Sequence, residues 1–142
     1  MVPARPWIPL LCTLRELLRE RTGYAPNFVL VNYYRSGRDC IGWHADDERD
    51  LGNAPTILSL SLGATRDFQL RHREAFPRAG QAARRHELQT VTIPLCSGSL
   101  LIMRDPTNKN WKHQLPRRGG TQAATIGARL NLTWRRIVVP GT

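Results

Sequence analysis

Long apolar runs, paired cysteines and acidic side chains are all scarce in this 142-residue sequence. No stretch approaches the roughly 18 apolar residues that a membrane-spanning helix needs. The first residues also lack the apolar region of a secretion signal. We therefore expect an intracellular protein with no membrane partner, in the cytoplasm or nucleoid of a bacterium or in the nucleus of a eukaryote.

The three cysteines, Cys12, Cys40 and Cys96, are far apart, and no two of them form a CxxC pair. Zinc sites and dithiol redox centres usually depend on such closely spaced pairs. We therefore expect neither kind of site and interpret the three side chains as reduced thiols of the core.

Basic residues outnumber acidic ones by 21 to 11, which gives a formal net charge of +10. Such a charge attracts polyanions, above all nucleic acid, over long distances. A solvated surface rich in arginine would give the same charge without any partner. The net charge alone therefore leaves nucleic-acid binding open.

The chain length fits a single domain, residues 1–142. Leucines at helical spacing predict an amphipathic helix from Pro9 to Arg21, with Gly23 just past its end. Short segments rich in apolar and β-branched residues follow at about 27–34, 40–45, 56–62, 66–72, 88–95, 99–103 and 128–139. Many short strands after one helix favour a mainly β sandwich or jelly roll, because alternating β/α folds need helices between the strands.

A possible metal-binding pattern lies in the predicted strand 40–45 and just after it. His44 and Asp46 are two residues apart, so a strand would present both on one face. An imidazole beside a carboxylate suits a divalent metal, and a second imidazole would complete the facial triad of non-heme iron(II) oxygenases. His113 follows the apolar run 100–103 and can enter from a neighbouring strand, which makes it the natural third ligand. H-x-D alone, however, arises by chance far more often than as a ligand pair.

The last predicted strand has one polar face, formed by Arg129, Asn131, Thr133 and Arg135. This face is either ordinary solvent surface or the lining of a polar cavity. A cavity with two arginines would need an anionic guest to offset the cost of desolvation. A dicarboxylate fits, because Arg129 could hold one end of 2-oxoglutarate while Arg135 neutralises the end that chelates the metal.

A third predicted strand contributes two more polar side chains. Asn32 and Tyr34 share one face of this strand, and both could hydrogen-bond a carboxylate. The plainer alternative is that they simply end a core strand before the turn at Ser36 and Gly37.

Five sequence blocks, in this order, resemble the AlkB family of iron(II)/2-oxoglutarate dioxygenases, and the resemblance runs from about Pro6 to Ile137. They are N-Y-Y-x-x-G-x-D-x-I-G-W-H-A-D-D-E (32–48), S-L-S-L-G-A-T-R-D-F (59–68), G-S-L-L-I-M (98–103), W-K-H-Q-L-P (111–116) and R-L-N-L-T-W-R (129–135). The blocks are most similar to the DNA-repair branch. The resemblance implies a mainly β fold, a double-stranded β-helix (jelly roll) core with an N-terminal amphipathic helix.

The resemblance also implies a set of ligands and site residues. Iron(II) would bind His44, Asp46 and His113, with 2-oxoglutarate and O2 as cosubstrates. The 2-oxoglutarate contacts would come from Asn32, Tyr34, Arg129, Asn131, Thr133 and Arg135, and Asp47 and Glu48 would face a flipped cationic base. The implied activity is oxidative demethylation of bases such as 1-methyladenine or 3-methylcytosine in DNA, with release of formaldehyde, succinate and CO2.

Several arginines resemble the loops that grip the duplex backbone in relatives that prefer double strands: Arg71, Arg73, Arg78, Arg84, Arg85, Arg117 and Arg118. Arg66 and Asp67 are expected to be structural, either tuning the site or forming an ordinary ion pair.

We expect a monomer without the N-terminal nucleotide-recognition lid of the relatives. Such a protein would bind nucleic acid, in the first place DNA, through its arginine-rich loops and an open pocket. Two alternatives stay open, namely the same chemistry on RNA and a catalytically silent basic module that only binds nucleic acid.

Overall fold

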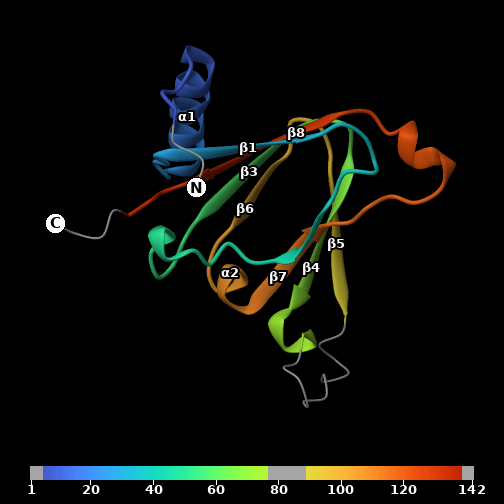
Figure 1. Ribbon diagram of the computed structural model, residues 1–142. Helices are drawn as coiled ribbons and strands as arrows, with labels where there is room; N and C mark the ends of the chain where they lie inside the picture. Colours follow the sequence, from blue (N-terminus) through green and yellow to red (C-terminus); the bar gives the residue numbers. More distant parts are fainter. Residues whose placement is uncertain (1–4, 77–88, 139–142) are drawn as a thin grey trace.

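The computed structural model describes residues 5–76 and 89–138 and contains two four-stranded antiparallel sheets that face each other (Figure 1). The first sheet has the order β1 (Phe28–Tyr34), β8 (Arg129–Arg135), β3 (Ile57–Gly63) and β6 (Leu100–Met103). The second has the order β2 (Ile41–His44), β7 (Trp111–Leu115), β4 (Arg66–His72) and β5 (Thr90–Leu95). Because the chain crosses repeatedly between the sheets, the predicted mainly β jelly-roll fold is confirmed.

The predicted N-terminal helix is α1, which spans Pro9–Thr22. It ends at Gly23, whose φ of 70° lies in the left-handed region that glycine adopts without strain. The Gly23 amide donates a hydrogen bond of 2.9 Å to the carbonyl oxygen of Arg19. The other helical elements of residues 5–76 and 89–138 are short: η1 (Arg49–Leu51), η2 (Arg73–Ala75), α2 (Thr107–Asn110) and η4 (Thr121–Ala124).

Two apolar clusters hold these layers together. One lies between the sheets and contains Leu51, Ile57, Phe68, Leu95 and Met103. The other lies where α1 meets the outer face of the first sheet and contains Leu18, Leu58, Leu132 and Trp134. Ile57 and Leu58 are adjacent in β3 but belong to different clusters, because successive side chains of a strand point to opposite faces of the sheet.

The structure differs from the sequence prediction at two strands. β7 was not among the predicted strands, because its W-K-H-Q-L sequence mixes polar and apolar side chains. β8 ends at Arg135 rather than at residue 139. Beyond it, the Asn27 side chain accepts a 2.7 Å hydrogen bond from the Ile137 amide and donates a 2.9 Å bond to the Ile137 carbonyl oxygen. This side chain takes the place of a ladder partner after the strand has ended.

The cysteines are free thiols, as expected, but they do not belong to the core. Cys12 is half-buried, while Cys40 and Cys96 are exposed. The expectation of core thiols was therefore wrong. Among the described residues, no helix is both long and apolar enough to cross a membrane.

The contact between α1 and the sheet predicts a stability difference between two adjacent leucines. Leu18 is 7% exposed and packs on Trp134, whereas Leu17 is 47% exposed. Leu18→Ala should lower the free energy of unfolding by about 2–4 kcal/mol, because it leaves a cavity in the cluster. Leu17→Ala should change it by less than about 1 kcal/mol. Urea unfolding followed by circular dichroism measures both, and equal losses would contradict the assigned helix face.

Candidate metal centre and cosubstrate pocket

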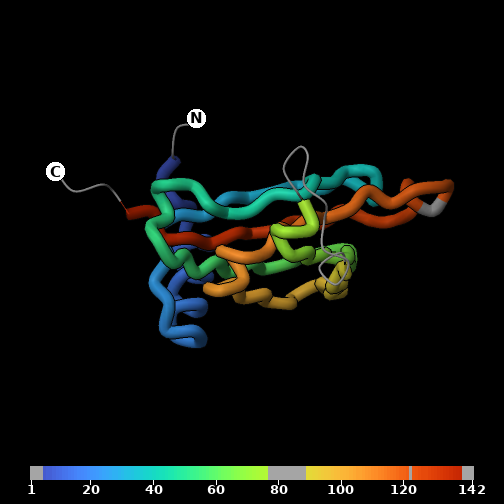
Figure 2. Tube along the Cα trace, turned by 90° about the horizontal axis from the view of Figure 1, so that it is seen from below, coloured from blue at the N-terminus to red at the C-terminus, as the bar shows by residue number. Residues whose placement is uncertain are grey.

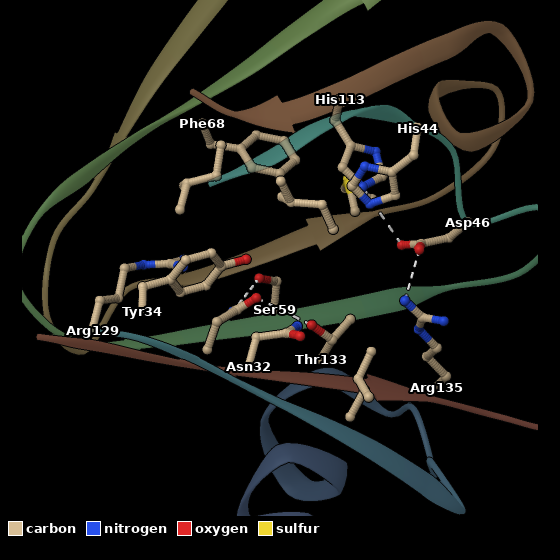
Figure 3. Close-up of a pocket in the computed structure, with 15 residues that line it drawn as sticks. Asn32, Tyr34, His44, Asp46, Ser59, Phe68, His113, Arg129, Thr133 and Arg135 are labelled. Atoms are coloured by element: carbon tan, nitrogen blue, oxygen red, sulfur yellow. Dashed lines mark hydrogen bonds and ion pairs between the residues drawn. The ribbon is translucent and has the colours of Figure 1, made fainter. Parts of the chain in front are cut away.

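A pocket between the two sheets collects most of the polar side chains singled out in the sequence. Figure 3 shows His44, His113 and Asp46 at one end, with Arg135 next to Asp46. Tyr34 and Arg129 lie at the opposite end. The remaining predicted members, Asn32, Asn131 and Thr133, also line the pocket. The two candidate sites are therefore two ends of one cavity.

The two histidines come from neighbouring strands. His44, the last residue of β2, lies directly opposite His113 of β7 in the ladder, and their ring centroids are 4.2 Å apart. Asp46 lies beyond the end of β2, so the two-residue strand period does not place it, contrary to the sequence argument. Its Oδ2 atom is 3.8 Å from Nε2 of His113. One ligand atom from each residue lies within 4.8 Å of the other two, so one ion can contact all three.

The surroundings of the two imidazoles show which of their nitrogens can face a metal. Burial, as the main cause, lowers the pKa of His113 to about 3, so this ring is neutral at physiological pH. Phe68 stacks on it with a centroid distance of 5.1 Å. Nδ1 of His44 is 2.8 Å from the Gly42 carbonyl oxygen. Because that oxygen only accepts, Nδ1 carries the proton and Nε2 is left for a metal.

Asp46 is 3% exposed and has a cationic partner. Nη2 of Arg135 donates a 2.7 Å hydrogen bond to its Oδ1 atom. Burial raises the pKa of the Asp46 carboxyl, while Arg135 acts in the opposite direction. Nη1 of Arg135 also reaches Glu48, at 3.1 Å. Arg135 thus fixes one oxygen of Asp46 and leaves the other facing the histidines.

The opposite end of the pocket is a buried cationic site. Arg129 is buried, and its Nη2 donates a 2.8 Å hydrogen bond to Oγ of Ser61. The guanidinium carbon lies 5.3 Å from the centre of the Tyr34 ring. Burial lowers the pKa of Arg129 and raises that of Tyr34, so the phenol keeps its proton.

A short polar network lies between the two ends. Thr133 donates a 3.1 Å hydrogen bond to Oδ1 of Asn131, whose Nδ2 donates a 2.8 Å bond to Oγ of Ser59. The contacts of Ser59 and Ser61 with the polar residues of β8 were not predicted from the sequence. The alternation S-L-S-L could have revealed them, because it places both hydroxyls on the face opposite the leucines.

The side chains present fit an iron(II) ion and a dicarboxylate. Two imidazoles and one carboxylate whose ligand atoms lie within 4.8 Å of one another are the ligand set of the facial triad. Nε of Arg129 and Nε of Arg135 are buried without a hydrogen-bond partner among the described residues. Buried donors of this kind are costly unless an anion satisfies them.

The two predicted base-facing carboxylates lie outside this pocket and are engaged by arginines. Asp47 is exposed and forms a 2.9 Å ion pair with Arg73, while Glu48 pairs with Arg135. Asp47 and Arg73 line an adjoining depression that reaches Asp46. The acidic pair therefore borders the metal cluster, with part of its charge already neutralised.

The predicted nucleic-acid arginines are spread over several surfaces. Arg71 lies on the outer face of the second sheet, where it contacts the Trp43 ring at 5.0 Å and Oγ1 of Thr90 at 2.7 Å. Arg117 is exposed, and Arg118 forms an ion pair with Asp67. The other predicted members, Arg78, Arg84 and Arg85, lie outside the described residues.

Arg66 and Asp67 do not pair with each other, and the ordinary ion pair of the two alternatives is found for Asp67 alone, with Arg118. As adjacent residues of β4 they point to opposite faces, and Arg66 is buried while Asp67 reaches Arg118.

Comparisons with known proteins agree with the jelly-roll fold and with the family that the sequence blocks resemble. The model of the 2OG-Fe(II) oxygenase superfamily matches residues 1–135. The chain is 44% identical to human "DNA oxidative demethylase ALKBH2" over 95% of its length and 49% of the relative's. It is 39% identical to "Alpha-ketoglutarate-dependent dioxygenase alkB homolog 3" of Rattus norvegicus over 96% of its length and 44% of the relative's.

A solved structure, "The structure of OsALKBH1", superimposes with a TM-score of 0.56 at 24% identity over 92% of this chain and 65% of that one, which supports the fold. The chain spans about half the length of the curated relatives it matches. Because the family model covers nearly the whole chain and these relatives are AlkB proteins, the chain belongs to the AlkB family of the 2OG-Fe(II) oxygenase superfamily.

Proposed function

We propose that this chain is an iron(II)- and 2-oxoglutarate-dependent dioxygenase that removes N-methyl groups from DNA bases of the 1-methyladenine and 3-methylcytosine type. The observation that carries the proposal is one pocket with a His-Asp-His cluster at one end and a buried, partly unsatisfied arginine at the other. The names of the human and Rattus norvegicus relatives, a DNA oxidative demethylase and a dioxygenase, support the same chemistry.

In this proposal His44, Asp46 and His113 hold the metal. Bound iron(II), with 2-oxoglutarate and O2, supplies the oxidising power that hydroxylates an N-methyl carbon, which leaves as formaldehyde beside succinate and CO2. The protein contributes ligand geometry through the facing positions of the two histidines in β2 and β7. Asp46 and His113 are buried, which would limit the access of water to the centre.

The cosubstrate would span the pocket between its two cationic ends. Arg129 and the Tyr34 hydroxyl would bind the distal carboxylate, which would satisfy the buried Nε of Arg129. Arg135 would offset the charge of the chelating end while it keeps Asp46 in place. The remaining wall would consist of Asn32, Asn131 and Thr133.

The substrate would approach from the side of Asp47 and Glu48. Their carboxylates would favour a cationic methylated base, an attraction that the pairing with Arg73 and Arg135 reduces. Contacts to the nucleic-acid backbone would come from the arginines predicted from the sequence: Arg71, Arg73, Arg84, Arg85, Arg117 and Arg118. The net charge of +10 supports a polyanionic partner. We further propose that the protein is intracellular. We also propose that it is a monomer, because a single chain supplies every residue of the pocket.

Metal binding should depend on Asp46 and not on its neighbour. Asp46→Asn removes one anionic ligand and should weaken Co(II) binding, followed by its visible absorption, at least about 100-fold. Asp47→Asn is the matched control, because Asp47 is exposed and its partner is Arg73. Its Co(II) affinity should stay within about threefold of the wild type, and equal losses in both variants would contradict the assigned ligand set.

The activity itself is tested with methylated single- and double-stranded DNA and RNA oligomers, incubated with iron(II) and 2-oxoglutarate and scored by mass. Demethylated DNA and formaldehyde are expected. His44→Ala should abolish both while circular dichroism stays unchanged, because only a ligand is lost.

Other outcomes would replace parts of the proposal. Turnover of RNA alone would change the substrate, and succinate without any demethylated oligomer would refute both nucleic-acid substrates. Nucleic-acid binding that is indifferent to iron and 2-oxoglutarate, with no succinate formed, would indicate a silent binding module.

A further inference from the structure

Arg66 is a buried cation that the proposed chemistry does not use. It is the first residue of β4 and is 1% exposed, which places it among the largest fully buried side chains. Burying a guanidinium costs free energy, and hydrogen bonds or a partner charge must compensate for the lost hydration. The two terminal nitrogens of Arg66 are hydrogen-bonded, whereas its Nε is buried without a hydrogen-bond partner among the described residues.

The Arg66 guanidinium binds main-chain carbonyl oxygens from two separate segments. Nη1 donates to Ser36 at 3.1 Å, and Nη2 donates to Asp39 at 2.9 Å and to Pro116 at 2.8 Å. Ser36 and Asp39 belong to the turn that joins β1 to β2, and Pro116 begins the connection from β7 to β8. Figures 1 and 2 show the turn and the connection side by side, at the end of the molecule away from α1.

The turn is also fixed from its other side. The Gly37 amide donates a 3.0 Å bond to the carbonyl oxygen of Ala123, and the Arg118 amide donates a 2.8 Å bond to that of Gly37. A Cβ atom at Gly37 would come within 2.8 Å of the Ala123 oxygen, so the segments are in close contact. Tyr34 pairs with Arg129 in the ladder between β1 and β8 and lies two residues before Ser36, so the Arg66 contacts hold the chain directly after the strand that carries Tyr34.

Arg66 also lies close to the cationic end of the pocket. Its guanidinium carbon is 5.9 Å from the centre of the Tyr34 ring, and that of Arg129 is 5.3 Å from the same centre. Both guanidinium groups lower the pKa of Tyr34, against the larger opposing effect of burial. Two positive groups therefore act on one buried phenol.

The charge of Arg66 is not cancelled by a carboxylate in direct contact. Its three hydrogen bonds within the described part of the chain all end on neutral carbonyl oxygens. The nearby Asp39 carboxylate is held by Arg35, at 2.8 and 2.9 Å, and Asp67 by Arg118. In a buried site such a charge acts over several ångströms with little screening.

We infer that Arg66 is a positioning residue for the distal carboxylate of the cosubstrate, because it fixes Tyr34 through the turn and adds positive charge at that end of the pocket. The inference rests on the proposed function. Its consequence is selectivity, since Arg66 should favour a 2-oxo dicarboxylate over a 2-oxo monocarboxylate of equal length.

The test compares two ligands in the Co(II)-loaded 142-residue chain. Titrations monitored by the Co(II) absorption give dissociation constants for 2-oxoglutarate and for 2-oxopentanoate, in which a methyl group replaces the distal carboxylate. Arg66→Met should weaken 2-oxoglutarate about tenfold or more, as expected for the loss of a buried charged interaction. It should leave 2-oxopentanoate within about twofold and the Co(II) affinity unchanged. Arg66→Lys, which keeps the charge without the fork, should lie between Arg66→Met and the wild type.

A merely structural role is excluded by a matched control. Leu18→Ala destabilises the protein at the α1 interface, away from the pocket, and should leave the ratio of the two dissociation constants unchanged. Equal weakening of both ligands by Arg66→Met, or loss of Co(II) binding, would overturn the inference. If Arg66→Met does not fold, the Arg66→Lys protein decides, and a ratio equal to that of the wild type overturns the inference.

The wild-type titration separates this inference from the proposed function. If the Co(II)-loaded wild type fails to bind 2-oxoglutarate, the proposed function is refuted and the inference with it. If the wild type prefers 2-oxoglutarate and the Arg66 variants keep the full preference, only the inference is wrong.

Discussion

The buried ion pair between Arg135 and Asp46 is the contact on which the candidate site depends. It joins the last residue of β8, in the first sheet, to the segment that follows β2, in the second. Asp46 has no place in the β2 ladder, so this 2.7 Å contact does for its side chain what strand pairing does for His44 and His113. A buried ion pair contributes little net stability, but losing one partner leaves an uncompensated charge. The pair therefore serves geometry more than folding energy.

The inner face of β8 explains why the protein needs stabilisation elsewhere. Four polar side chains of this strand line the pocket, where a jelly roll would otherwise bury apolar ones. The apolar contacts are found instead in two clusters, one around Ile57 and Phe68 and one between α1 and the first sheet. The helix thus offsets, on the outer side of the sheet, the hydrophobic burial that the pocket removes from the inner side.

Local periodicity accounts for what could be predicted from the sequence. The alternation in β8 placed Arg129 and Arg135 on one face, and the strand pattern around His44 and the position of His113 indicated a shared site. Asp46 reached that site for a different reason, a contact with a residue 89 positions away, which no local pattern contains. The same holds for Asp47, whose partner Arg73 comes from another segment. β7 escaped prediction because alternation in five mixed residues is a weak signal.

His44 lies in an edge strand, and this position affects the local opening of the sheet. Among the described strands, β2 pairs with β7 alone, and its ladder to β7 contains a register irregularity between Ile41 and His44. Such an edge opens at a lower free energy than the centre of a sheet. An ion shared by His44 and His113 would act as a cross-link across this weak seam. Metal binding and the pairing of β2 with β7 would then be coupled, so that a bound ion would stabilise the paired state of the two strands.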